Sequence, residues 1–207
     1  MTMDERAARN AAGTADYRAL IQRRRADLSA ELQILVTPSP SLVCEIGCGH
    51  GHFLSAYAQS HPQELCIGLD IVGERIDRAN RKRERAGLAN LHFLHADARL
   101  FLEALPDSAR FSRIFVLFPD PWPKSRHHKH RILQSEFFTT LARFARADTR
   151  LYFRTDYAPY FESTRETLQA HAFWAISEEP WPFEHPSVFQ NRAPSFFSLV
   201  ARLHSFS

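Results

Sequence analysis

Four carboxylates stand at the ends of short apolar segments in this sequence, and a glycine-rich turn accompanies the first of them. In chain order these acids and glycines are Glu45, Gly47, Gly49, Gly51, Asp70, Asp97 and Asp120. Carboxylates accept hydrogen bonds and pair with cations, and a glycine turn lets the backbone approach a ligand closely. The pattern predicts a pocket for a ligand that carries hydrogen-bond donors and positive charge.

The charge of this pocket indicates the class of ligand. Asp70 lies about twenty residues beyond the turn, the position of a carboxylate that accepts both ribose hydroxyls of an adenosine cofactor. Such acids would repel a pyrophosphate, and the turn contains no Lys or Arg to offset them. S-adenosylmethionine carries a sulfonium and an ammonium that suit Glu45, and Asp97 can accept from the adenine amine. The alternative is that these acids only cap the following helices, Asp97 especially.

The stretch FPDPWPKSRHHKHR, residues 118–131, is the second feature whose residue types could take part in a reaction. Prolines on both sides of Asp120 restrict its backbone, and Trp122 offers a flat face on which a base can stack. This arrangement resembles the Asp-Pro-Pro-aromatic loop of methyltransferases that act on nitrogen. The basic residues that follow can trace an RNA backbone, and they are Lys124, Arg126, Lys129 and Arg131. A solvated basic loop is the alternative.

Apolar runs alternate with segments of helical period along most of the chain. The expected strands are 41–47, 65–71, 91–97, 113–118 and 150–156, and the expected helices are about 51–60, 73–86, 98–105, 134–146 and 158–170. This alternation predicts an α/β fold with a doubly wound, mostly parallel sheet of the Rossmann-like type. Two β-rich runs without a helix between them, 174–179 and 195–204, are expected to pair as an antiparallel C-terminal hairpin.

The chain of 207 residues has room for one well-filled core. Residues 1–36, rich in Ala and Arg, are expected to form a basic helical extension, and 37–207 the ligand-binding domain. No apolar run approaches the roughly 18 residues of a membrane span, so we expect a cytoplasmic protein. Three cysteines without a CxxC pair and histidines without completing ligands indicate no metal site.

These motifs together resemble the bacterial tRNA (guanine-N7)-methyltransferases, whose most specific signature is the FPDPWPK-x-RHxKRR loop. The similarity extends from Cys44 to about Arg192 and includes EIGCGHG, GLDI, HAD and RTDYAPY. It implies a class I methyltransferase that uses S-adenosylmethionine and acts on a guanosine in the variable loop of tRNA. It also implies that the acids named above contact the cofactor, with Asp120 nearest the reaction. The substrate contacts that it implies are Lys124, Asp156, Ser187, Phe189, Gln190 and Arg192.

The sequence departs from the family pattern in the last of these motifs. Ser187 stands where the family has Thr, and Gln190 where it has Glu. An amide offers one acceptor oxygen where a carboxylate offers two, so guanine recognition is open to change. Two other hypotheses follow: an enzyme of the same fold that acts on another nitrogen acceptor, and a non-catalytic RNA-binding relative. The intact proline loop around Asp120 argues against the second.

A dense basic cluster occupies residues 75–85, in the second expected helix. Glu74 with Arg78 and Asp77 with Arg81 have the i,i+4 spacing of stabilising pairs. The sequence therefore favours an ordinary solvated helix face here.

Overall fold

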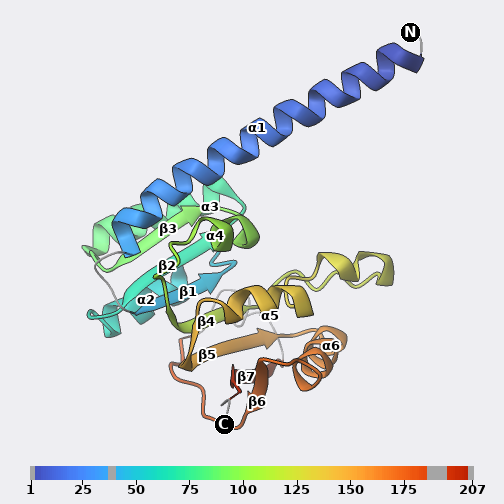
Figure 1. Cartoon of the computed structure of the whole chain (residues 1–207). Coiled ribbons are helices and arrows are strands. Elements are labelled where there is room, and N and C mark those ends of the chain that lie inside the picture. Colours follow the sequence, from blue (N-terminus) through green and yellow to red (C-terminus); the bar gives the residue numbers. More distant parts are fainter. Residues whose placement is uncertain (1–2, 37–40, 186–194, 205–207) are drawn as a thin grey trace.

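The computed structural model describes residues 3–36, 41–185 and 195–204, with side chains from residue 16 onward. Within them, one sheet has the strand order β3-β2-β1-β4-β5-β7-β6 (Figure 1). The strands are β1 (Leu42–Ile46), β2 (Leu65–Asp70), β3 (Leu91–His95), β4 (Phe111–Leu117), β5 (Ala145–Thr155), β6 (Trp174–Ser177) and β7 (Phe197–Leu203). The first five pair in parallel, and β7 pairs antiparallel with both β5 and β6. The predicted mostly parallel sheet with an antiparallel C-terminal pair is confirmed.

Helices cover both faces of the sheet. They are α1 (Met3–Val36), α2 (His52–Ser60), α3 (Gly73–Ala86), α4 (Ala98–Ala104), α5 (Ser135–Ala142) and α6 (Ala158–Gln169), with a 3₁₀ helix η1 (Ser125–His130). Side chains alternate across each strand, so Cys44 and Ile114 belong to one buried cluster and Val43 and Phe115 to the other. The first cluster includes residues of α1, α4, α5 and α6, and the second includes residues of α2 and α3.

Helix α1 extends well beyond the body of the molecule, and only its C-terminal part packs on the sheet layer (Figure 1). Leu28, Leu32 and Val36 lie one turn apart and are buried there. No helix within the described residues is long and apolar enough to cross a membrane. Whether residues 1–36 act as a separate extension stays a prediction.

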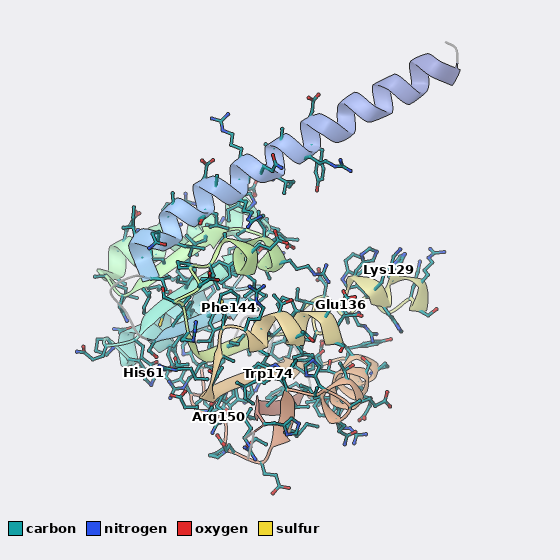
Figure 2. All side chains as sticks on the ribbon, in the orientation of Figure 1. His61, Lys129, Glu136, Phe144, Arg150 and Trp174 are labelled. Atoms are coloured by element: carbon teal, nitrogen blue, oxygen red, sulfur yellow. The ribbon has the colours of Figure 1, made fainter. Side chains whose placement is uncertain are left out.

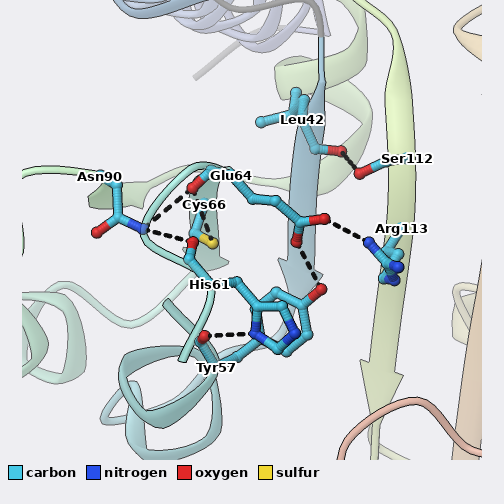
Figure 3. A network of polar contacts seen from close by, with 8 residues as sticks. All are labelled: Leu42, Tyr57, His61, Glu64, Cys66, Asn90, Ser112 and Arg113. Atoms are coloured by element: carbon cyan, nitrogen blue, oxygen red, sulfur yellow. Dashed lines mark hydrogen bonds and ion pairs between the residues drawn. The ribbon is translucent and has the colours of Figure 1, made fainter. Parts of the chain in front are cut away.

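A polar network lies at the end of the sheet where the parallel strands start (Figure 3). Glu64 accepts from the Tyr57 hydroxyl at 2.6 Å and pairs with Arg113 at 2.5 Å. The Asn90 amide donates to the carbonyls of Ala58, His61 and Glu64. These bonds join α2 to the starts of β2, β3 and β4, at the end of the sheet opposite the carboxyl ends of these strands.

Two expectations about element bounds were wrong. The helix expected over about 134–146 ends at Ala142, and β5 begins at Ala145 rather than near 150. Residues 145–149 contain no β-branched residue before Thr149, so their local propensity does not reveal a strand. Pairing of Phe111 with Ala145 places them in the sheet.

Candidate functional site

The sheet reverses its order between β1 and β4, because β2 and β3 lie on one side of β1 and β4 on the other. In open α/β sheets, ligands bind in the crevice outside the carboxyl ends of the strands at this point. The turn after β1 and the loop after β4 therefore lie at the expected ligand site.

The turn after β1 has a backbone that only glycine adopts easily. Gly47, Gly49 and Gly51 have φ angles of 78°, 55° and 68°, in the left-handed region. A Cβ on Gly51 would lie 2.3 Å from the Phe93 ring, whereas one on Gly47 or Gly49 would meet nothing within 4 Å. Gly51 is thus required by packing, and open space lies beside Gly47 and Gly49 for a ligand.

Glu45 is the least conventional group at this turn. Glu45 is only 3% exposed, and its Oε2 is buried with no hydrogen-bond partner among the described residues. Burial raises the pKa of this carboxyl to about 8, although a backbone hydrogen bond at Leu54 offsets part of the rise and the Asp70 charge adds to it. A buried carboxyl oxygen without a partner costs free energy until a cation or donor reaches it. Glu45 is accordingly suited to a cationic ligand.

Asp70 ends β2 and binds the glycine turn directly. The Gly49 N–H donates to Oδ2 at 3.0 Å, and the Val72 N–H donates to Oδ1 at 2.8 Å. Arg75 lies 3.6 Å from Oδ2. Each carboxylate oxygen has a further lone pair, so Asp70 can still accept two hydroxyl donors while it holds the turn.

Asp97 acts as the N-cap of α4. Its Oδ1 accepts from the backbone N–H groups of Arg99 at 2.9 Å and Leu100 at 3.3 Å. The capping role that the sequence left as an alternative is present, and both of these bonds use the same oxygen. The contact with an adenine amine stays a prediction, which Oδ2 could make.

A cavity of about 710 Å³ lies beside Asp97. Its wall combines Ile71 and Ala96 from the strand-end loops and Leu100 of α4 with Tyr17 and other residues of α1. Sequence reasoning missed Ile71, an apolar side chain that is 67% exposed directly after Asp70. Its position after the acid was the available signal, whereas nothing in the sequence indicated that α1 would form a wall.

The proline loop after β4 is bounded by two strained residues. Phe118 and Trp122 have φ angles of 50° and 45°, a conformation that is unfavourable for bulky side chains. Asp120 lies between them and is exposed. The Trp122 ring lies 5.0 Å from the His130 ring and 5.8 Å from the His127 ring, between centroids. The loop thus presents Asp120 to solvent beside a partly exposed aromatic face.

Arg131 holds this loop in place. It is 3% exposed, its Nε donates to the Pro121 carbonyl at 2.9 Å, and its Nη1 donates to Ser163 Oγ on α6 at 2.9 Å. Its guanidinium also lies over the Tyr160 ring at 4.8 Å. The expectation that Arg131 follows an RNA backbone was wrong, because the side chain is buried between the loop and α6.

The other basic residues of the run are exposed. Lys124, Arg126 and Lys129 belong to η1 or its cap, and η1 projects from the body of the molecule, as the label of Lys129 marks in Figure 2. The sequence had predicted an irregular loop here. Because η1 projects, these charges lie in solvent, away from the glycine turn after β1.

The end of β5 completes the described site. Asp156 is exposed directly after Thr155, whereas the neighbouring Arg154 is buried. Arg154 donates from Nη1 to Glu184 at 2.9 Å and lies 3.8 Å from the centre of the Trp181 ring. Sequence reasoning missed Arg154, although an arginine directly after the apolar run Leu151–Phe153 was a signal. The predicted substrate residues Ser187, Phe189, Gln190 and Arg192 lie outside the described residues.

Comparison with known proteins decides the family. Residues 39–195 match a model described as a putative methyltransferase. A tRNA (guanine-N(7)-)-methyltransferase of Magnetococcus marinus is 34% identical over 173 residues, 80% of this chain and 68% of the relative. One of Thermosynechococcus vestitus is 33% identical over 156 residues, 72% of this chain and 73% of the relative. The chain belongs to the tRNA (guanine-N7)-methyltransferase family.

Solved structures agree with this membership at the level of the fold. The antibiotic-resistance methyltransferase Kmr superimposes with a TM-score of 0.57 at 22% identity, covering 86% of this chain and 94% of its own. The aminoglycoside resistance methyltransferase NpmB1 superimposes with a TM-score of 0.58 at 18% identity, covering 85% of this chain and 93% of its own. This family member therefore has the class I methyltransferase fold, as the sequence predicted.

The histidines of this methyltransferase do not gather into a metal-binding group. His50 and His52 flank Gly51 with ring centroids 6.3 Å apart, and His127 and His130 lie 6.0 Å apart beside Trp122. No group of three or more possible metal ligands exists within the residues that the structure describes.

Proposed function

We propose that the protein transfers the methyl group of S-adenosylmethionine to N7 of a guanosine in tRNA, in the cytoplasm. The observation that carries the proposal is the buried carboxyl of Glu45, whose Oε2 has no hydrogen-bond partner among the described residues. It lies beside an open glycine turn, one strand away from the exposed Asp120. A cationic methyl donor suits the first of these groups and a nitrogen acceptor the second.

The residues of the turn fit S-adenosylmethionine better than a dinucleotide. Glu45 would face the positive charge of the cofactor, Asp70 would accept from the ribose hydroxyls, and Ile71 and Leu100 would pack against the base. Gly47 and Gly49 leave room for the ligand to approach the backbone. When bound, the cofactor supplies an electrophilic methyl group on sulfur.

Catalysis by this chain would consist mainly of positioning. Guanine N7 already presents a lone pair in the plane of the base, so methyl transfer needs no prior deprotonation. The base becomes cationic as it is methylated, and the Asp120 and Asp156 carboxylates can stabilise this charge or accept from the guanine N–H groups. Arg131 keeps the proline loop that carries Asp120 in place.

The remaining substrate contacts would orient the RNA. Lys124 at the start of η1 is exposed and can bind a phosphate, and Trp122 can stack on a base. We extend the assignment of the acceptor to the variable loop of tRNA from the family resemblance. The relatives named above carry the same activity in their names.

One departure supports a second candidate function. Gln190 replaces the carboxylate of the family motif, so the same fold could act on another nitrogen acceptor. A non-catalytic role is less well supported, because the strain at Phe118 and Trp122 is costly to keep in a loop without a function.

The experiment combines the purified protein with labelled S-adenosylmethionine and unmodified tRNA, followed by mass spectrometry of the nucleosides. We expect 7-methylguanosine, and we expect Asp120→Ala to form much less of it. The exposed Asp107→Ala serves as a matched control that keeps full activity. A different methylated nucleoside would establish the second candidate, and no labelled nucleoside with the parent protein would contradict both.

A further inference from the structure

A surface groove of about 330 Å³ lies on the other side of the glycine turn from the cavity near Asp97. Every described residue that lines it is basic or carries an imidazole, and these residues are His50, His52, Arg78, Arg81, Lys82 and Arg85. No carboxylate from the described part of the chain lines the groove. Its surface is therefore suited to an anion.

The four basic residues of the groove lie on one face of α3. Arg81 and Lys82 are adjacent, and each lies three or four residues from Arg78 and from Arg85 in a helix that repeats every 3.6 residues. Successive turns rise about 5.4 Å, so the charges form a row along the helix and not a point. A row of this kind matches a polymer of phosphates better than a single small anion.

The acids of α3 do not neutralise this row. Among the described residues, the ion pairs of α3 join Arg75 to Asp70 and Arg83 to Glu84. The pairs expected from the sequence, Glu74 with Arg78 and Asp77 with Arg81, are not formed, so that expectation was wrong. Arg78, Arg81 and Arg85 are exposed, and their guanidinium groups can each bind a phosphate through two parallel hydrogen bonds.

A direct hydrogen bond joins the groove to the glycine turn after β1. The Lys82 ammonium donates to the carbonyl of His50 at 2.9 Å, and His50 and His52 flank Gly51. Burial lowers the pKa of Lys82, and the nearby Arg85 lowers it further. Burial also lowers the pKa of His52, with smaller contributions from Lys82, His50 and His185. Positive groups are thus crowded together beside the site, where an anion would relieve their repulsion.

We propose that this groove, the α3 groove, binds backbone phosphates of the substrate RNA. It would be a second RNA contact in addition to the one at η1, so that the RNA is held on both sides of the glycine turn. The inference rests on the proposed function, because it takes tRNA as the substrate. It assigns a role to charges that the sequence alone favoured as a solvated helix face.

The test is the salt dependence of tRNA binding, measured by fluorescence anisotropy between about 50 and 200 mM salt, the range over which phosphate contacts lose most affinity. The groove variant is the triple substitution Arg78→Gln, Arg81→Gln, Arg85→Gln. The control removes the same charge outside the groove through Arg83→Gln, Arg143→Gln, Arg146→Gln. Binding of S-adenosylmethionine and thermal unfolding are measured for both.

We expect the groove variant to bind tRNA more weakly and its plot of log affinity against log salt to be less steep by about 3, since each of the three lost phosphate contacts changes the slope by about 1. The control should keep the slope of the parent, and both variants should keep cofactor affinity. A groove variant with the parent's slope, or a control that loses as much, would overturn the proposal. A parent that does not bind tRNA would instead contradict the proposed function itself.

Discussion

The end of β1 with its glycine turn and the loop after β4 belong to neighbouring strands, and each carries one acid, but the two are built in opposite ways. Glu45 is buried, its Oε2 has no hydrogen-bond partner among the described residues and its pKa is raised, whereas Asp120 is exposed in a strained loop that the buried Arg131 holds. The first is a pocket shaped before the ligand arrives, and the second is a platform open to a large substrate. Affinity for cofactor and affinity for RNA should therefore respond to different residues.

The largest expected effect on the cofactor side is that of Asp70→Ala. This change removes the acceptor of the Gly49 N–H bond that holds the glycine turn and of the Val72 N–H bond in the loop after β2, as well as the proposed ribose contact. Bonds to charged groups contribute about 1.5–3 kcal/mol each, so affinity for S-adenosylmethionine should fall by at least about 10²-fold. Calorimetry measures this, with the exposed Asp77→Ala as control. Unchanged affinity, or tight binding of NADH by the parent, would contradict the pocket assignment.

On the RNA side, Lys124→Ala and Asp156→Ala should leave cofactor affinity near that of the parent. Both side chains are exposed and distant in sequence from the glycine turn. Methylation of tRNA should fall by about 10²-fold for Asp156→Ala, which removes a carboxylate that stabilises the developing positive charge. It should also fall for Lys124→Ala, which removes a phosphate contact. Kinetics with tRNA and calorimetry with cofactor separate the two effects. If both variants lost cofactor affinity as well, the division between pocket and platform would be wrong.

A smaller effect is expected from Arg131→Lys, which keeps the charge but loses the fork that joins Pro121 to Ser163. The loss of one such bond, about 1.5 kcal/mol, should lower kcat by about tenfold through misplacement of Asp120. Cofactor affinity should be unchanged. The exposed Arg126→Lys is the control, and equal activity of the two variants would show that Arg131 does not position the loop.

The smallest effect is expected from Gln190→Glu. Restoring the carboxylate of the family motif adds an acceptor for the guanine N–H groups, so methylation should rise or stay the same, with cofactor affinity unchanged. The same assay with tRNA measures it. An inactive variant, from a parent that methylates another acceptor, would favour the second candidate function.

Much of the fold could be predicted from the sequence, because the buried strands are apolar runs that end in acids and glycines. The start of β5 could not, since Ala145 and its neighbours enter the sheet through pairing with β4, which local propensity does not report. The placement of α1 beside the cavity near Asp97 is likewise a tertiary feature.

The site followed the same division. Glycines with positive φ and strand-end acids were predictable from residue type and spacing. The burial of Arg131 could not be predicted, because the local sequence of a basic run does not distinguish a buried arginine from a solvent-exposed one. The open charges of α3 were also missed, since i,i+4 spacing permits ion pairs but does not require them.

The proposed binding of a cationic cofactor depends most on Glu45, whose pKa is raised from its usual 4.5 to about 8 by burial. A raised pKa means that the folded state binds this proton more tightly, so stability without cofactor should fall as pH rises from about 4.5 to about 8. A cationic cofactor needs the ionised acid, so its affinity should instead rise with pH over the upper part of this range. Glu45→Gln carries no such proton and should show neither dependence.

The most direct test is calorimetric titration of S-adenosylmethionine into the parent and Glu45→Gln between about pH 6 and pH 8, in buffers of different ionisation enthalpy. We predict that the parent releases close to one proton on binding at the lower pH and gains affinity by up to about tenfold per pH unit. The variant should bind more weakly and release no proton from this position. Identical proton release and affinity in parent and variant would contradict the claim that the Glu45 carboxyl receives the cation of the methyl donor.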